Sequence, residues 1–220
     1  MFSKKELNYL CNGEHGDPYK ILGLHIENDK ASIIAFLPEA KKAWVVKEDN
    51  NEERIYEMLK IHRNGLYEIS FEKTKKTFRY RLKILSDLNE YKEFYDPYSF
   101  QKPILTDYDL HLIGEGTHYK NYEKIGAHII EIDGIKGIHF SLWAPNAKRV
   151  SVIGDFNRWD GRRHPMRMLG NSGIWEIFIP GLEEGTLYKF EVLSRFNNYK
   201  EQKVDPFAYF LEVRPKSASI

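Results

Sequence analysis

The chain has 220 residues, which is enough for one large domain or for two domains of about 100 residues each. Its 33 Lys and Arg residues nearly balance its 32 Asp and Glu residues, so the net charge of +1 gives no reason to expect a nucleic acid or an acidic membrane as partner. The single cysteine, Cys11, excludes an internal disulfide and fits a reducing compartment. The N-terminus lacks the apolar core of a signal peptide, and no stretch approaches the ~20 apolar residues of a membrane span, so we expect a cytoplasmic protein.

The first residues predict a short helix. Ser3 is placed to cap it, and Glu6 follows three residues later as in a capping box. Leu7 and Leu10 would then share one face of the helix, which we expect to end before Gly13.

Downstream of this helix, alternating apolar and polar residues predict β-strands. The clearest alternation covers residues 77–84, and further strands are expected over residues 174–179 and 187–192. Residues 117–124 allow one or two helical turns in an otherwise weakly periodic connector. The signals therefore favour an all-β protein with short helical segments.

The stretch that begins at Gly137 predicts a β-hairpin. Apolar residues alternate over 138–142, the chain turns at 144–146, and a second strand is expected over 150–153. A loop over 154–159 then carries an indole beside Asn and Asp side chains. Such a loop is well suited to binding sugar, because an indole stacks on the apolar face of a pyranose ring.

The chain also repeats itself with a period of domain size. Four short segments in the first half resemble segments 107 to 110 residues further on. The pairs are residues 36–42 and 143–149, 64–69 and 172–177, 78–80 and 188–190, and 96–98 and 205–207. The repeat predicts two tandem immunoglobulin-like antiparallel β-sandwiches, with short helical segments at the N-terminus and in the connector.

This organisation divides the chain into five parts. We expect an N-terminal helical segment at 1–16, a first β-sandwich at 17–100, a connector at 101–125, a second β-sandwich at 126–212 and a terminal segment at 213–220.

The second half resembles the N-terminal region of glycogen branching enzymes (1,4-α-glucan branching enzymes). The matching residues are 122–123, 126–128, 140–145, 154–157, 159–166, 172–176, 187–189, 205–206 and 214–215. The first half matches more loosely, over residues 15–19, 22–23 and 95–100. The string Asp160–Met166 is specific, because debranching enzymes and the β-subunits of AMP-activated kinases share Gly154–Trp159 but do not usually carry that basic extension.

The resemblance implies a fold and an activity. Members of the family carry an N-terminal β-sandwich and then a carbohydrate-binding module, which would be residues 126–212, followed by a (β/α)8 catalytic barrel and a C-terminal β domain. The family cleaves an α-1,4-glucan and rejoins the piece through an α-1,6 bond. No acidic residue of this chain matches the barrel motifs, so we expect no catalytic residue here, an inactive chain on its own, and residues 213–220 to begin a linker to the barrel.

Four residues are candidates for contacts to an α-1,4-glucan such as glycogen, amylose or a maltooligosaccharide. Trp159 would stack on a pyranose ring; the alternative is that it packs under its own loop or against the barrel. Lys189 and Tyr199 match a lysine and a second aromatic platform of related glycan-binding modules; the alternatives are a solvated lysine and an ordinary turn tyrosine. Asn157 could bond a sugar hydroxyl or simply form the turn.

Arg162, Arg163 and His164 form a short basic run. Such a run is ordinarily a solvated loop, whereas the resemblance implies contacts to the catalytic barrel of the full-length enzyme. Trp143 and Trp175 lie in expected strands, and we expect both in the core.

Cofactor signals are missing from the sequence. The eight histidines show no metal-ligand spacing, and the glycines form neither a dinucleotide-binding nor a phosphate-binding pattern, so we expect no metal and no cofactor. The prediction is therefore the non-catalytic, α-glucan-binding part of a branching enzyme. Two alternatives stay open: a stand-alone glycogen-targeting or regulatory module, and a purely structural pair of domains without sugar binding.

Overall fold

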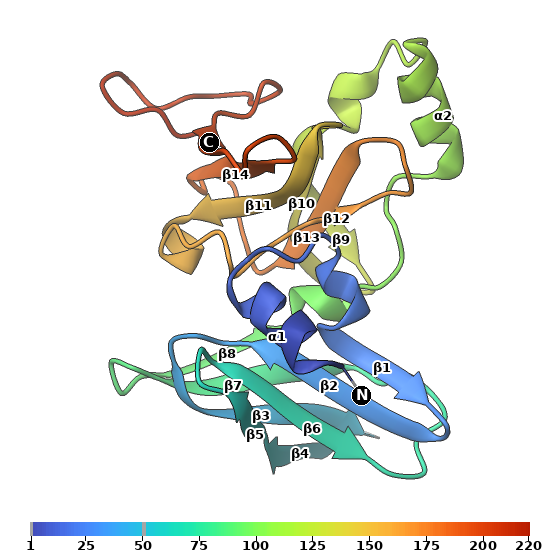
Figure 1. Ribbon diagram of the computed structural model, residues 1–220, viewed down its shortest axis with the longest axis vertical. Coiled ribbons are helices and arrows are strands. Elements are labelled where there is room, and N and C mark those ends of the chain that lie inside the picture. The colour runs from blue at the N-terminus through green and yellow to red at the C-terminus, as the bar shows by residue number, and fades with distance from the viewer. Residues whose placement is uncertain (1, 50–51) are drawn as a thin grey trace. The chain divides into compact units, whose positions relative to one another are not determined.

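A computed structural model describes residues 2–49 and 52–220 of the chain (Figure 1). Its contacts divide the chain into two compact units. The first comprises Met1–Cys11 and Tyr19–Gln101, and the second comprises Asn12–Pro18 and Lys102–Ile220. Each unit holds two antiparallel sheets and a few short helical segments, which confirms the predicted all-β class with two sandwiches. No described helix is long and apolar enough to cross a membrane.

The first unit begins with α1 (Lys4–Cys11), and its capping box forms as predicted. The Ser3 backbone N–H donates to the Glu6 carboxylate at 2.8 Å, and the Glu6 N–H donates to the Ser3 hydroxyl at 3.2 Å. Leu10 and Cys11 are buried, so one side of the helix is packed against the protein. The helix is thus fixed by its cap and by its apolar face.

The two sheets of the first unit have the strand orders β1-β2-β6-β5 and β4-β3-β7-β8. The strands are β1 (Gly23–Glu27), β2 (Lys30–Phe36), β3 (Ala40–Asp49), β4 (Glu52–Glu57), β5 (Leu59–His62), β6 (Leu66–Phe71), β7 (Tyr80–Ser86) and β8 (Tyr91–Tyr95). Short 3-10 turns cover Pro18–Lys20 and Pro97–Ser99. The strand expected over 77–84 begins later, at Tyr80, and runs to Ser86.

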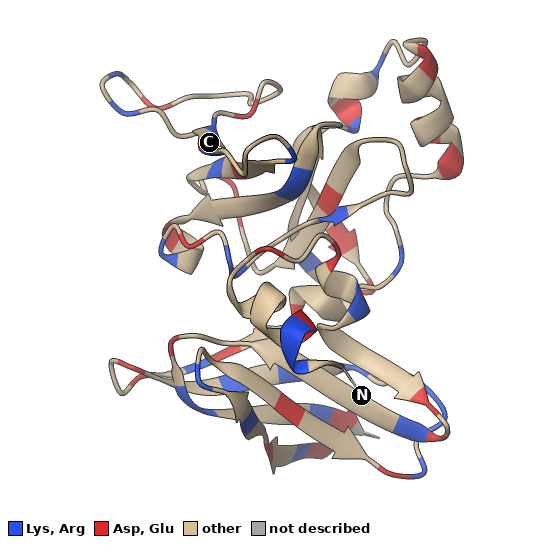
Figure 2. Ribbon diagram, in the orientation of Figure 1, with Lys and Arg blue, Asp and Glu red and all other residues tan. Residues whose placement is uncertain are grey.

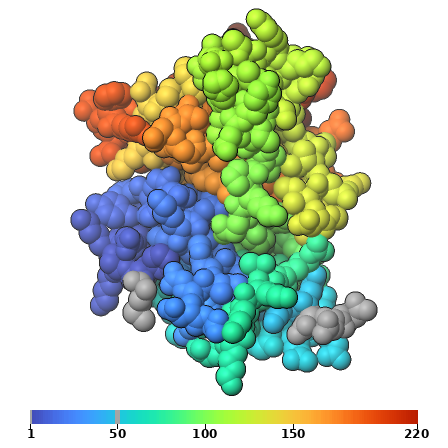
Figure 3. Space-filling model, turned by 90° about the vertical axis from the view of Figure 1, so that its right-hand side faces the viewer, coloured from blue at the N-terminus to red at the C-terminus, as the bar shows by residue number. Residues whose placement is uncertain are grey.

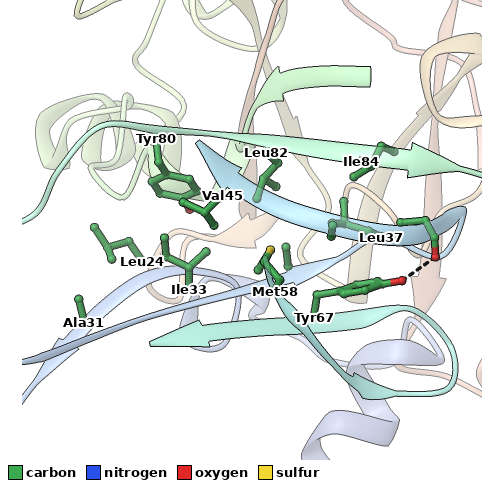
Figure 4. Close-up of a cluster of buried hydrophobic side chains, with 13 residues drawn as sticks. Leu24, Ala31, Ile33, Leu37, Val45, Met58, Tyr67, Tyr80, Leu82 and Ile84 are labelled. Atoms are coloured by element: carbon green, nitrogen blue, oxygen red, sulfur yellow. Dashed lines mark hydrogen bonds between the residues drawn. The ribbon is translucent and has the colours of Figure 1, made fainter. Parts of the chain in front are cut away.

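The core of the first unit lies between its two sheets (Figure 4). Ile33 from one sheet faces Val45 and Leu82 from the other, and all three side chains are buried. The Tyr67 hydroxyl donates to the Ala40 carbonyl at 2.6 Å, so this large ring is buried without an unpaired polar atom. Burial of one side chain of the size of leucine stabilises the fold by about 1.5–3 kcal/mol.

The second unit contains α2 and two further sheets. The sheets have the orders β12-β13-β10-β9 and β11-β14-β15. The elements are α2 (Asp107–Glu115), β9 (Gly126–Ile132), β10 (Ile135–Trp143), β11 (Ala147–Gly154), β12 (Arg167–Met168), β13 (Ile174–Pro180), β14 (Tyr188–Ser194) and β15 (Lys200–Lys203), with 3-10 turns at Asn121–Glu123 and Asp155–Asn157. Figure 3 shows α2 and the residues after it as a yellow-green lobe of the surface.

The predicted hairpin in this unit is wrong. β10 pairs with β9 and β13, whereas β11 pairs with β14 in the other sheet, so the turn at 144–146 carries the chain from one sheet to the other. Both edges of β10 are already occupied by its neighbours. The alternating pattern of β10 suggested that one face of the strand is exposed, but the polar residues His139 and Ser141 are buried as well as the apolar residues beside them.

The internal repeat appears in the structure as an equivalent tyrosine–aspartate hydrogen bond in each unit. The Tyr80 hydroxyl donates to Asp96 at 2.5 Å, and the Tyr188 hydroxyl donates to Asp205 at 2.6 Å. Each aspartate precedes a proline and accepts the backbone N–H two residues on, at 3.0 and 2.8 Å. Burial raises the pKa of Asp96 to about 6, although its hydrogen bonds oppose the change, and burial also raises the pKa of Asp205.

A buried carboxylate fixes the connector to the second unit. Glu176 on β13 accepts the backbone N–H groups of Ile104 and Leu105 at 3.1 and 3.2 Å. It also accepts a hydrogen bond from the Arg167 guanidinium at 2.7 Å and lies 3.2 Å from the His139 ring nitrogen. Burial alone would raise the pKa of Glu176, but His139 and Arg167 outweigh it and lower the pKa below its ordinary value.

The two tryptophans expected in the core have different surroundings. Trp175 is buried, and its indole N–H donates to the Ala144 carbonyl at 3.0 Å. Trp143 is 61% exposed, so its core assignment is wrong. It is the last residue of β10, where the chain leaves the sheet and the outward face is open.

Candidate functional site

The loop over residues 155–166 follows β11, and its first turn is tightly built. A Cβ atom at Gly154 would come within 2.3 Å of the Leu187 carbonyl oxygen and 2.5 Å of the Phe156 ring, so only glycine fits there. Arg158 and Trp159 both adopt left-handed backbone conformations, with φ of 58° and 57°. Residues other than glycine rarely adopt the left-handed conformation, so the surrounding contacts must hold the loop in place.

Trp159 is held by two hydrogen bonds. Its backbone N–H donates to the Gly154 carbonyl at 2.9 Å, and its indole N–H donates to the carboxylate of exposed Asp155 at 2.8 Å. The side chain is half-buried. The indole is therefore fixed in orientation while part of its surface stays in contact with solvent. Asp155 is the Asp expected beside the indole in this loop, although it was not among the four candidate contacts.

Asn157 forms the interior of the loop. The side chain is completely buried; its oxygen accepts the Gly154 N–H at 3.0 Å, and its nitrogen donates to the Val152 carbonyl at 2.8 Å. The same nitrogen lies 2.8 Å from Nδ1 of His164. Burial and the charge of Arg163 lower the pKa of His164 to about 3, so the ring is neutral and Nδ1 accepts this hydrogen bond. Of the two roles considered for Asn157, the geometry is that of the turn.

Arg162 is held beside Asp160. The Arg162 side chain donates to the Asp160 carboxylate from Nε at 2.9 Å and from a terminal nitrogen at 2.7 Å. Burial alone would raise the pKa of Asp160, but these bonds and the charges of Arg162 and Arg163 lower it. A Cβ at Gly13 would lie 3.0 Å from the Arg162 side chain, so Arg162 also packs on the segment Asn12–Pro18 of the same unit.

A buried ion pair lies under the same loop. Arg149 donates to Glu191 at 2.6 Å and to the Gly161 carbonyl at 2.6 Å. A Cβ at Gly161 would meet the Glu191 carboxylate at 2.1 Å. The glycine therefore lets the loop lie directly on the Arg149–Glu191 pair, which fixes the loop to β11 and β14.

Lys189 lies on β14, opposite Ile153 near the end of β11 that carries the loop. Its ammonium donates to the hydroxyl of exposed Ser217 at 2.8 Å. Residues 217–219 return beside the start of β14, because Ser219 and Tyr188 exchange backbone hydrogen bonds at 2.9 and 3.0 Å. Lys189 and the Trp159 loop thus belong to the same end of the sheet.

Tyr199 is placed elsewhere. Its carbonyl accepts the N–H of Ser194, which lies five residues along β14 from Lys189, a separation of roughly 17 Å. The Tyr199 hydroxyl donates to Glu201, and Glu201 pairs with Val192, which faces the opposite side of the sheet from Lys189. The structure brings Trp159, Asn157 and Lys189 to one end of the sheet and does not bring Tyr199 to them.

This end of the sheet offers a fixed indole, a carboxylate, an ammonium and a serine hydroxyl, groups that are able to stack on or hydrogen-bond to a ligand. Within residues 2–49 and 52–220, no three His, Cys, Asp or Glu side chains gather as a metal site.

Comparison with known families identifies both halves of the chain. Residues 3–98 match the N-terminal domain of alpha-1,4-glucan branching enzyme GlgB, and residues 124–208 match carbohydrate-binding module 48, the isoamylase N-terminal domain. The chain carries a GlgB N-terminal domain followed by a carbohydrate-binding module 48. The Trp159 loop and Lys189 therefore belong to its carbohydrate-binding module, and the helix α1 belongs to its GlgB N-terminal domain.

Two GlgB proteins support this assignment. The chain is 42% identical over 220 residues to the 1,4-alpha-glucan branching enzyme GlgB of Paramagnetospirillum magneticum, covering 100% of this chain and 29% of that protein. It is 46% identical over 211 residues to GlgB of Bradyrhizobium diazoefficiens, covering 96% of this chain and 28% of that protein. The chain thus spans less than a third of the length of these relatives. A pullulanase type I from Bacillus subtilis complexed with maltose aligns with 90% of this chain and 26% of that structure, at 14% identity and a TM-score of 0.37.

Proposed function

We propose that this chain is the non-catalytic, α-glucan-binding part of a glycogen branching enzyme, an enzyme that transfers α-1,4-glucan segments to form α-1,6 branches. The observation that carries the proposal is the succession, in one chain, of a GlgB N-terminal domain and a carbohydrate-binding module. The chain would hold an α-1,4-glucan for a catalytic barrel in the same polypeptide, and the setting would be the cytoplasm.

Trp159 is the proposed contact to the glucan. The indole stacks on the apolar face of a pyranose ring, and its N–H bond to Asp155 fixes the plane of the ring before the sugar arrives. Lys189 donates to a hydroxyl at the same end of the sheet, with Ser217 as its partner in the free protein. A site preorganised in this way loses little entropy on binding, but a flexible oligosaccharide does, so we expect a Kd on the order of 0.1–1 mM.

The catalytic barrel is the second proposed partner, through the basic run of the same loop. Arg162 and His164 already have partners inside the chain, so a contact there would add to an ordered loop. Arg163 lies between them, and its charge lowers the pKa of both His164 and Asp160, so it too interacts within the loop. Exchange of its charge in the full-length enzyme, as Arg163→Glu, would lower branching activity without changing glucan binding.

Affinity electrophoresis through gels that contain glycogen tests glucan binding. The wild type is expected to be retarded in proportion to the glycogen concentration, and Trp159→Ala is expected to lose most of that retardation. Trp143→Ala is the matched control, because Trp143 is an exposed tryptophan of the same unit outside the loop. Wild-type mobility that does not change with glycogen, or equal losses in the two variants, would refute the proposed site.

A further inference from the structure

A second aromatic surface lies in the first unit, on the side of the sheet β4-β3-β7-β8 that faces away from the core of that unit. We call this side the outer face. Side chains alternate along the strands, so Val45 and Leu82 point into the core while Trp44 and Lys83, which are paired across β3 and β7, lie on the outer face. Figure 2 shows both signs of charge along these strands. The mixture of aromatic and charged side chains distinguishes the outer face from the core.

Two rings form the centre of the outer face. Trp44 on β3 and Tyr91 on β8 meet across β7, with ring centroids 6.2 Å apart and planes inclined by 42°. Tyr91 is 67% exposed, and Trp44 is half-buried. Among the described residues, the Trp44 indole N–H has no hydrogen-bond partner, so it is available to an incoming acceptor. An exposed ring of this size beside a second ring is a surface for a flat apolar ligand face.

Charged groups of both signs surround the rings. Lys42 lies 3.8 Å from Glu57 beside Trp44, and Lys83 lies 5.6 Å from the centre of the Tyr91 ring. Further along the face, the Arg81 guanidinium forms ion pairs with three carboxylates, at 3.5 Å for Glu48, at 3.1 Å for Glu93 and also with Glu53. The three cations Lys42, Lys83 and Arg81 stand against the four carboxylates Glu57, Glu48, Glu53 and Glu93, so the named groups carry a net charge of only −1. The outer face offers donors and acceptors to a neutral ligand that carries many hydroxyl groups.

We propose that the outer face is a second carbohydrate-binding surface, which takes a neutral α-1,4-glucan with successive sugar rings on Trp44 and Tyr91. Lys42, Glu57 and Lys83 would bond the hydroxyl groups at the rim of these rings. The choice of an α-1,4-glucan rests on the proposed function; the stacking site itself rests on the geometry of the outer face.

The inclination of the two rings favours this ligand. Successive pyranose rings of an α-1,4-glucan are inclined to each other and the chain curves, whereas a β-1,4-glucan is a flat ribbon. Two aromatic planes inclined by 42° fit the first shape better than the second.

Fluorine NMR of the chain labelled with 5-fluorotryptophan tests the proposal. The protein has four tryptophans, so four resonances are expected, each assigned by a single Trp→Phe variant. Titration with maltoheptaose is expected to shift the resonances of Trp44 and Trp159. Tyr91→Ala is expected to raise the Kd reported by Trp44 by about threefold to tenfold, the loss of one stacked ring, and to leave the Kd reported by Trp159 unchanged. Tyr108→Ala, an equally exposed tyrosine on α2, is the matched control and is expected to change neither.

The outcomes separate the two proposals. A Trp44 resonance that does not move while Trp159 saturates, or a Trp44 titration that is the same in Tyr91→Ala, would overturn the outer face and leave the Trp159 site standing. A Trp44 resonance that shifts while the Trp159 resonance does not would support the outer face and overturn the Trp159 site. Cellohexaose that shifts Trp44 as strongly as maltoheptaose would overturn the assignment to an α-1,4-glucan.

Discussion

The substitution Glu176→Gln would test how the connector is attached to the second unit. It keeps the size of the side chain but removes the charge that Arg167 and His139 face. It also leaves the Ile104 and Leu105 N–H groups with at most one remaining oxygen between them. Removal of one partner of a buried ion pair costs about 3–5 kcal/mol, because the other charge stays buried without compensation. We expect a loss of that size in the free energy of unfolding of the second unit.

Urea unfolding followed by the near-UV circular dichroism of the tryptophans would give this free energy, and amide hydrogen exchange at Ile104 and Leu105 would locate it. Glu131→Gln is the matched control, because Glu131 is an exposed carboxylate of the same sheet, and its change should stay within about 0.5 kcal/mol. The lowered pKa of Glu176 means that its contribution is present above the ordinary glutamate pKa of about 4.3 and is lost as the pH falls. A loss below about 1 kcal/mol at pH 7, or unchanged exchange at both amides, would refute the reasoning.

Further predictions concern the pH dependence that Asp96 gives to stability and the substitution of two glycines. The pKa of Asp96 is raised to about 6 in the folded state, so its contribution to stability, about 3 kcal/mol, is present below pH 4 and is lost as the pH rises through 6. Urea unfolding at pH 4.5 and 7.5 should show this loss in the wild type, and Asp96→Asn should abolish the difference between the two pH values. An unchanged difference in the variant would contradict the prediction. Gly161→Ala should cost about 1–3 kcal/mol through the clash with Glu191. Gly114 lies in α2, where an added Cβ would meet no other atom, so Gly114→Ala should instead stabilise the protein by about 0.5–1 kcal/mol. Thermal unfolding measures both variants, and melting temperatures that change in the same direction would refute these two predictions.

The sequence predicted the fold class well, because each unit repeats the same signals. Alternation located the strand at Ile174, and the spacing of Ser3 and Glu6 located the first helix with its capping box. The partners of the strands were harder to predict. The turn at 144–146 looks like a hairpin turn, but β10 is buried on both faces and paired on both edges, and a single strand's pattern does not reveal its neighbours.

The candidate site was predictable only in part, for a similar reason. The loop that holds Trp159 was evident from its residue types, but the burial of Asn157 depends on hydrogen bonds back to β11. The position of Tyr199 depends on the register of β15, which no local signal fixes. The outer face depends on three strands that lie side by side, so Trp44 and Tyr91 are far apart in sequence and adjacent in space.

The return of residues 217–219 to β14 has a practical consequence for anyone who wishes to express the carbohydrate-binding module alone. The family match ends at residue 208, which is a tempting place to stop a shortened gene. A protein cut there would lack the backbone partner of Tyr188 and the hydroxyl that Lys189 binds, and it would leave the first residues of β14 as an open edge. Such a fragment would be prone to self-association, and assays on it would understate the binding expected at the proposed glucan site.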